Sequence, residues 1–235
     1  MGSSTRLGKR RGFARFDNND GEGEASAELL PLIATAARQE PRPPRQSMSQ
    51  FDREKWNAKH AAGLAMPREP AAVFVGLAPY LPRRGRALDV AGGAGRHGIW
   101  LAQRGLDVTI ADISSRGLAL AREQAAEAGV QVATLETDLE IDPFPAGRWD
   151  LIVSVCYLLR PLYSIYPQSL APGGILAVVQ PTKKNLERHD KPPADFLLDE
   201  GELPLLVSGL EIVHSQEGWL ADGRHDAVIV ARKPR

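Results

Sequence analysis

The chain has 235 residues, enough for one α/β domain with short extensions but too few for two full domains. Its 29 basic and 29 acidic residues cancel, so the composition does not point to a nucleic-acid partner, and the single cysteine, Cys156, excludes an internal disulfide. No apolar run reaches the roughly 20 residues that cross a bilayer, so we expect a cytoplasmic protein with no membrane or nucleic-acid partner.

Residues 1–47 combine glycine, proline and mixed charge without a sustained hydrophobic period. This composition predicts a disordered N-terminal extension. The basic start would also suit a transit peptide or a phosphate-binding arm, but the acidic residues that follow it disfavour both. Organised sequence begins at Met48, so we predict a folded domain over residues 48–235.

Two helices are predicted before the first strand, at residues 51–62 and 70–81, where the larger apolar side chains recur at helical spacing. Because they precede the sheet, we expect region 48–82 to lie across its open end as a lid. The alternative is that Trp56 and His60 simply pack on the core.

Residues 88–102, LDVAGGAGRHGIWLA, are the most informative stretch of the chain. They predict the end of a buried strand, a tight turn of small residues, and a helix that stops at Gly105. Glycines allow a ligand to approach the backbone closely, and the start of a helix offers free N–H groups. This arrangement predicts a site for a nucleotide-like ligand.

The rest of the chain alternates strands and helices. Strands are predicted at 86–90, 106–112, 130–135, 149–155 and 175–180, and helices at 95–104, from Ser114 or Ser115, at 161–170 and near 195–207. Strands this rich in Val, Ile and Leu are typical of a parallel sheet with helices on both faces. Residues 209–219 and 223–233 predict a C-terminal antiparallel β-hairpin. The fold class is therefore α/β and Rossmann-like.

The glycine turn alone does not identify the ligand. Gly93, Gly95 and Gly98 have the G-x-G-x-x-G spacing of dinucleotide sites, which makes an NAD(P)-binding oxidoreductase one hypothesis. Against it, Asp89 ends the first strand, where a carboxylate would repel a pyrophosphate and suits a cationic amine. Asp138 adds a second acid at the ligand edge, and a hairpin replaces the second βαβ half.

Taken in order, these motifs resemble the class I S-adenosylmethionine (SAM) dependent methyltransferases. The resemblance covers about residues 51–233 and rests on DVAGGAG at 89–95, Asp112, Asp138 with Leu139, WDLIVSV at 149–155 and LAPGGILAVV at 170–179. GAGRHGIWLAQRGLDVT is similar to the tellurite-resistance-type small-molecule methyltransferases. The resemblance implies the class I methyltransferase fold, with a mostly parallel seven-stranded sheet, and SAM as cofactor.

The resemblance also implies which residues hold the methionine end of SAM. They are Asp89, Ala91, Gly92, Gly93, Gly95 and Arg96. Asp89 and the turn backbone would hold the methionine part, and Arg96 would pair with its carboxylate. Ala91 stands where a glycine is usual, and we expect its φ to stay negative because alanine tolerates positive φ poorly.

At the other end of the cofactor, Asp112 would accept both ribose hydroxyls, since it lies within the roughly 20-residue separation from the turn expected for this role. By resemblance, Ile113 and Leu139 would sandwich the adenine and Asp138 would accept its exocyclic amine. Val155 completes the predicted cofactor-binding set.

The acceptor site is predicted from strand ends. Methyl transfer from a sulfonium depends mainly on positioning and desolvation, so a thiolate or oxyanion acceptor needs no general base, whereas an alcohol or amine would. The candidates are Val155, Cys156, Tyr157, Gln180 and the hairpin-tip residues Glu217, Trp219, Arg224 and His225. Of these, Tyr157 and His225 are the predicted catalytic residues.

We therefore predict methyl transfer to a small-molecule acceptor: a thiol, a chalcogen oxyanion or a comparable metabolite. The alternatives are the NAD(P)-binding oxidoreductase and a SAM-binding module without turnover. No metal site is predicted, because His214 and His225 lie far apart along the hairpin.

Overall fold

The computed structural model describes residues 45–63 and 67–235, with side chains from Ser49 onward. The predicted disordered extension lies outside the described residues up to residue 44. Within the described ranges, no helix combines the length and the apolar character needed to cross a bilayer.

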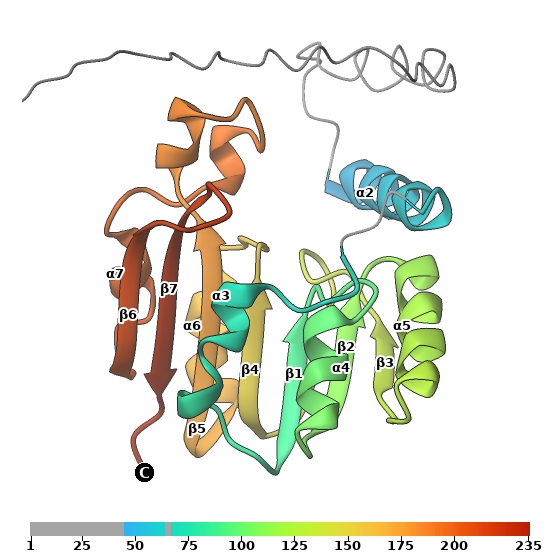
Figure 1. Ribbon diagram of the computed structural model, residues 1–235, viewed down its shortest axis with the longest axis horizontal. Coiled ribbons are helices and arrows are strands. Elements are labelled where there is room, and N and C mark those ends of the chain that lie inside the picture. Colours follow the sequence, from blue (N-terminus) through green and yellow to red (C-terminus); the bar gives the residue numbers. More distant parts are fainter. Residues whose placement is uncertain (1–44, 64–66) are drawn as a thin grey trace, which may run out of the picture. The chain divides into compact units, whose positions relative to one another are not determined.

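A seven-stranded sheet in the order β3-β2-β1-β4-β5-β7-β6 forms the centre of the domain (Figure 1). The strands are β1 (Arg86–Val90), β2 (Asp107–Asp112), β3 (Ala133–Glu136), β4 (Trp149–Val155), β5 (Leu170–Pro181), β6 (Glu211–Trp219) and β7 (His225–Arg232). Strands β1 to β5 pair in parallel, and β7 runs antiparallel to both β5 and β6. The predicted mostly parallel sheet with a C-terminal antiparallel hairpin is confirmed.

Helices cover both faces of this sheet. They are α3 (Ala72–Val75), α4 (Arg96–Gln103), α5 (Ser115–Glu127), α6 (Leu162–Ser169) and α7 (Glu202–Leu206), whereas α2 (Arg45–Ala61) packs on α5. The 3-10 turns are η2 (Ala78–Tyr80), η3 (Lys183–Glu187) and η4 (Ala194–Phe196). Successive β5 residues alternate between two core clusters: Leu176 packs with the α6 and α7 side, and Ala177 with the α3, α4 and α5 side. This alternation follows from the period of two in a strand.

Several predicted boundaries differ from the structure. The helix expected over residues 70–81 is wrong, because Pro79 has no N–H and its ring clashes with the carbonyl four residues earlier; the segment forms α3 and η2 instead. Strand β5 begins at Leu170, before the predicted start at residue 175, so the APGG residues at 171–174 belong to the strand. Helix α2 begins at Arg45, earlier than expected.

The parallel strands bring their carboxyl ends to one edge of the sheet, and the hairpin tip lies at the same edge. Asp226 of β7 pairs with Pro181 at the end of β5, and His225 pairs with Trp219 across the hairpin. The loops after β1, β2, β4 and β5 therefore lie at the same edge of the sheet as the tip of a hairpin that is distant in sequence.

Candidate functional site

The turn after β1 requires glycine for two reasons: its backbone adopts positive φ values, and it leaves no room for a Cβ atom. Gly93 and Gly95 have φ values of 55° and 81°, in the left-handed region that favours glycine. A Cβ at Gly95 would lie 2.7 Å from Ile110 Cδ1, and one at Gly98 would lie 2.8 Å from Ile110 Cγ1. The spacing that matches a dinucleotide fingerprint is thus accounted for by the packing of α4 against β2.

Ala91 departs from our expectation. Its φ is 53°, not negative. The expectation was wrong because the Gly92 N–H must donate to the Ala111 carbonyl, at 3.2 Å, to start the turn directly after the strand. The cost of this conformation in a non-glycine residue is about 1 kcal/mol.

Asp89 lies beneath the turn, with 1% of its surface exposed. Its Oδ2 accepts a hydrogen bond of 2.9 Å from the Gly98 N–H, which ties the end of β1 to the first turn of α4. Burial raises the pKa of Asp89 to about 7. Asp89 therefore positions the turn, and its contact with a ligand amine stays a prediction.

Asp112 ties the end of β2 to the glycine turn. Its Oδ2 accepts from the Gly93 N–H and its Oδ1 from the Ser114 N–H, both at 2.8 Å. Burial raises the pKa of this carboxyl. Each carboxylate oxygen has a second lone pair, so the group can accept two further hydrogen bonds from a ligand.

Asp138 follows β3 and has an unused acceptor. Its Oδ1 accepts from the Glu140 N–H at 3.0 Å, while its Oδ2 is buried without a partner among the described residues. Leu139 beside it is buried in the core cluster, and Ile113 is half-buried. A donor such as an exocyclic amine would satisfy the free oxygen of Asp138.

On the other side of the turn, Arg96 is the first residue of α4 and is half-buried. Burial lowers the pKa of its guanidinium, and the neighbouring Arg224 acts in the same direction. Val155 is half-buried at the end of β4. Cys156 follows it with a φ of 58°, and its N–H donates to the Val179 carbonyl at 2.8 Å.

The hairpin tip contacts the end of β4 through Arg224. Its Nη1 donates to Cys156 Sγ at 3.4 Å and its Nη2 to Asp226 Oδ2 at 2.8 Å. Asp226 is fully buried, and its Oδ1 has no partner among the described residues. Burial raises the pKa of the Cys156 thiol, so it stays protonated at neutral pH. The sequence indicated Arg224 but not Asp226, because a carboxylate inside a strand pattern is usually exposed.

The two predicted catalytic residues have different environments. Burial raises the pKa of Tyr157 above its usual range, so its phenol is a hydrogen-bond donor and not a base at neutral pH. His225 is 7% exposed, and its Nδ1 lies 2.8 Å from Thr182 Oγ1. His225 and Asp226 point to opposite faces of the sheet, as successive strand residues do, so the structure does not bring His225 together with Arg224.

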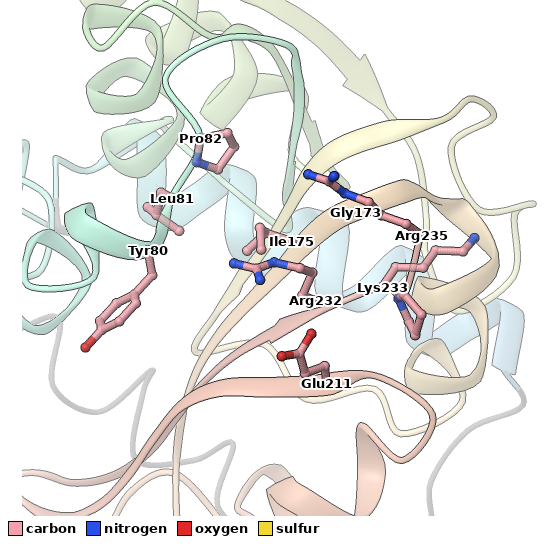
Figure 2. Close-up of a pocket in the computed structure, with 10 residues that line it drawn as sticks. Tyr80, Leu81, Pro82, Gly173, Ile175, Glu211, Arg232, Lys233 and Arg235 are labelled. Atoms are coloured by element: carbon pink, nitrogen blue, oxygen red, sulfur yellow. The ribbon is translucent and has the colours of Figure 1, made fainter.

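One open pocket lies away from this edge. It has a volume of about 520 Å³ and lies where β5 and β6 begin and β7 ends (Figure 2). Tyr80, Ile175, Glu211 and Arg232 are among its lining residues. Asp89, Asp112 and Asp138 lie at the opposite edge of the sheet, at the carboxyl ends of the parallel strands.

Residues 87–174, which contain the glycine turn and all three acids, match the family of methyltransferase domains. The chain has the fold of a class I SAM-dependent methyltransferase. The resemblance and the fold class predicted from the sequence are confirmed.

Among solved structures, TehB from Haemophilus influenzae superposes with a TM-score of 0.60 and 22% identity, covering 70% of this chain and 62% of that one. Magnesium protoporphyrin IX methyltransferase from Synechocystis, with bound SAM, has a TM-score of 0.60 and 16% identity, covering 83% of this chain and all of that one. At these identities the likeness concerns the fold.

Among curated proteins, the demethylmenaquinone methyltransferase of Thermus thermophilus is 36% identical over 104 residues, 40% of this chain and 46% of the relative. An uncharacterized protein of Mycobacterium tuberculosis is 41% identical over 73 residues, 31% of this chain and 27% of the relative. The matched stretches span less than half of these relatives.

Proposed function

We propose that this chain is a methyltransferase that uses SAM to methylate a small-molecule acceptor. The observation that carries the proposal is the set of acids around the glycine turn, in the region that matches methyltransferase domains. Asp112 is tied to the turn, and Asp138 has a buried oxygen free for a donor. Asp89 favours SAM over NAD(P), because a carboxylate beneath the turn suits the cationic methionine end of SAM and would repel the pyrophosphate of NAD(P).

In this proposal Asp112 accepts the ribose hydroxyls and Asp138 accepts the adenine amine. Ile113 and Leu139 flank the adenine ring. These roles fit the two oxygens of Asp112, which keep lone pairs available, and the unsatisfied Oδ2 of Asp138.

At the methionine end, the backbone of the turn formed by Ala91, Gly92, Gly93 and Gly95 is proposed to contact the cofactor; all but Gly95 are partly exposed. Arg96 at the start of α4 pairs with the methionine carboxylate. Bound there, SAM would supply a methyl group activated by its sulfonium, which an acceptor nucleophile would take with SAH as the leaving group. The chain's own residues orient the two substrates and exclude water.

The acceptor site is proposed beyond Val155, between Cys156, Tyr157 and the hairpin tip. Tyr157 would orient an acceptor by donating a hydrogen bond, which its raised pKa permits. His225 is a second proposed catalytic residue. A thiol or an oxyanion is favoured, because the chain then needs no base. The small-molecule class is also supported by the names of the demethylmenaquinone and magnesium protoporphyrin enzymes.

Calorimetric titration with S-adenosylhomocysteine (SAH) and with NAD tests the cofactor. We expect SAH to bind and NAD not to bind; the reverse result would refute the proposal. Asp112→Asn should weaken SAH binding about 10-fold or more, through loss of charge-assisted hydrogen bonds. Asp107→Asn, at the exposed start of the same strand, is the matched control and should bind SAH as the wild type does.

Turnover is tested with SAM labelled on its methyl group and a panel of thiols, tellurite, selenite, phenols and amines. Label on one class of acceptor identifies the reaction. A chain that binds SAH but labels no acceptor would instead be a SAM-binding module without turnover.

A further inference from the structure

Helix α2 lies over the proposed ribose site and is attached to it by polar contacts. Asn57 Oδ1 accepts a hydrogen bond of 2.7 Å from Ser114 Oγ at the start of α5. Arg53 Nη1 donates to the Ile113 carbonyl at 3.3 Å. Since Ile113 and Ser114 directly follow Asp112, these contacts hold α2 beside the acid proposed to bind the ribose.

Few apolar contacts hold α2 in place. Among its described side chains, only those of Ser49 and His60 are buried. Phe51 and Trp56 are 53% and 38% exposed, and neither core cluster includes a described residue of this helix. Hydrogen bonds contribute about 1 kcal/mol each, far less than a buried apolar face. The helix is therefore attached weakly enough to undock.

The His60 ring lies against the backbone of two elements of the site. A Cβ at Gly93 would lie 3.4 Å from His60 Cε1, and a Cβ at Gly117 would lie 2.9 Å from His60 Nε2. Burial lowers the pKa of His60, and the facing Asp112 only partly opposes this. A neutral ring carries one donor and one acceptor nitrogen.

One nitrogen of this ring is unsatisfied. His60 is 7% exposed, and its Nδ1 is buried with no hydrogen-bond partner among the described residues. An unsatisfied buried polar atom costs about 1–3 kcal/mol. A ligand that forms a hydrogen bond with His60 Nδ1 would remove this energetic cost. Because His60 belongs to α2, the bond can form only while α2 is docked.

We propose that His60 contacts the cofactor: its Nδ1 hydrogen-bonds a ribose hydroxyl of bound SAM, and this bond keeps α2 closed over the site. The inference rests on the proposed SAM site. A ribose hydroxyl donates to Asp112 and still has lone pairs for a second bond, so one sugar can satisfy both side chains. Cofactor binding and docking of α2 then strengthen each other by the same factor.

The contact is tested by titrating the full chain with SAH. His60→Ala should weaken binding about 5-fold to 10-fold, the equivalent of one hydrogen bond, and His60→Asn should recover part of the loss. Glu54→Gln, on the exposed side of the same helix, is the matched control and should leave the affinity unchanged. Urea unfolding without ligand checks that each variant folds.

Ligand variants show whether the contact is direct. SAH and its 2′-deoxy and 3′-deoxy analogues are compared on the wild type and on His60→Ala. The analogue that lacks the contacted hydroxyl should lose less affinity on His60→Ala than on the wild type, because the bond is already absent. Equal losses on both proteins for both analogues would overturn the proposal.

Amide hydrogen exchange measures closure. SAH should slow exchange in α2 of the wild type about 10-fold, and less in His60→Ala. If the wild type binds no SAH, the proposed function fails. If it binds SAH, but His60→Ala binds equally well and α2 exchange does not change, only the role of His60 and α2 fails.

Discussion

Two residues at the site hold backbone conformations that glycine adopts more easily. Ala91 has a φ of 53° and Cys156 a φ of 58°. Each directly follows the carboxyl end of a strand, β1 and β4. Conformations of this kind persist only where the surrounding structure enforces them, and they concentrate at functional sites. Here they lie at the edge where cofactor and acceptor are proposed to meet.

Replacing Ala91 by glycine should stabilise the protein. Ala91→Gly removes the left-handed strain, so the free energy of unfolding in urea should rise by about 0.5–1 kcal/mol. Ala94 lies in the same turn and its φ is not positive. Ala94→Gly should therefore lower the same free energy, and a gain there would contradict the strain argument.

Asp89 makes stability depend on pH. Because burial raises its pKa from 3.8 to about 7, the folded state holds a proton that the unfolded state has lost in this range. Asp89 therefore lowers the free energy of unfolding as the pH rises from about 4 to about 7, whereas buried His97, whose pKa is lowered to about 3, acts in the opposite direction. The pH slope of Asp89→Asn in urea unfolding should lack the Asp89 contribution and differ from that of the wild type, while Asp107→Asn should retain the wild-type slope. A parallel decline in wild type and Asp89→Asn would argue against the assignment.

At the scale of elements, the first and the last parts of the described chain, helix α2 and the β6–β7 hairpin, both reach the edge of the sheet where the site is proposed. The β6–β7 hairpin reaches the end of β4 through Arg224, and α2 reaches the glycine turn through His60. The first is held by an ion pair with the fully buried Asp226, and the second by hydrogen bonds and by the exposed ion pair of Arg53 with Glu136. We therefore expect the hairpin tip to be fixed and α2 to move.

Arg224→Ala should be destabilising, because it leaves the fully buried Asp226 carboxylate unpaired. We expect a loss of about 3 kcal/mol in urea unfolding at pH 8. The loss should be smaller at pH 5, since burial raises the pKa of Asp226 and the unpaired carboxyl can take up a proton. Asp222→Asn removes only an exposed partner of Arg224 and should cost less than about 1 kcal/mol.

At the scale of the whole molecule, both core clusters and every proposed site residue lie between Ser49 and the C-terminus. We therefore predict that residues 43–235 suffice for folding and cofactor binding. A chain of this length should have the urea midpoint and SAH affinity of the full chain. Weaker binding would mean that earlier residues take part in the site.

Much of the fold could be predicted from the sequence, because the signals are local. Hydrophobic runs located the strands, glycines follow the ends of α4 and α5, and Ser114, one of the two serines predicted at the start of α5, caps it. Asp112 and Asp138 were identified because parallel strands place their carboxyl ends at one edge. Pro79 shows that a local signal can also be missed, since it divides the helix predicted over residues 70–81.

The sequence by itself thus determined the order of elements, the class of fold and the acids around the turn. Tertiary structure alone decided the positive φ of Ala91, the burial of Asp226 and the position of His60 against Gly117. Each depends on groups far apart in the chain: His60 and Gly117 are brought together by the docking of α2 on α5. Periodicity reports which face of an element is buried, but not which distant residue covers it.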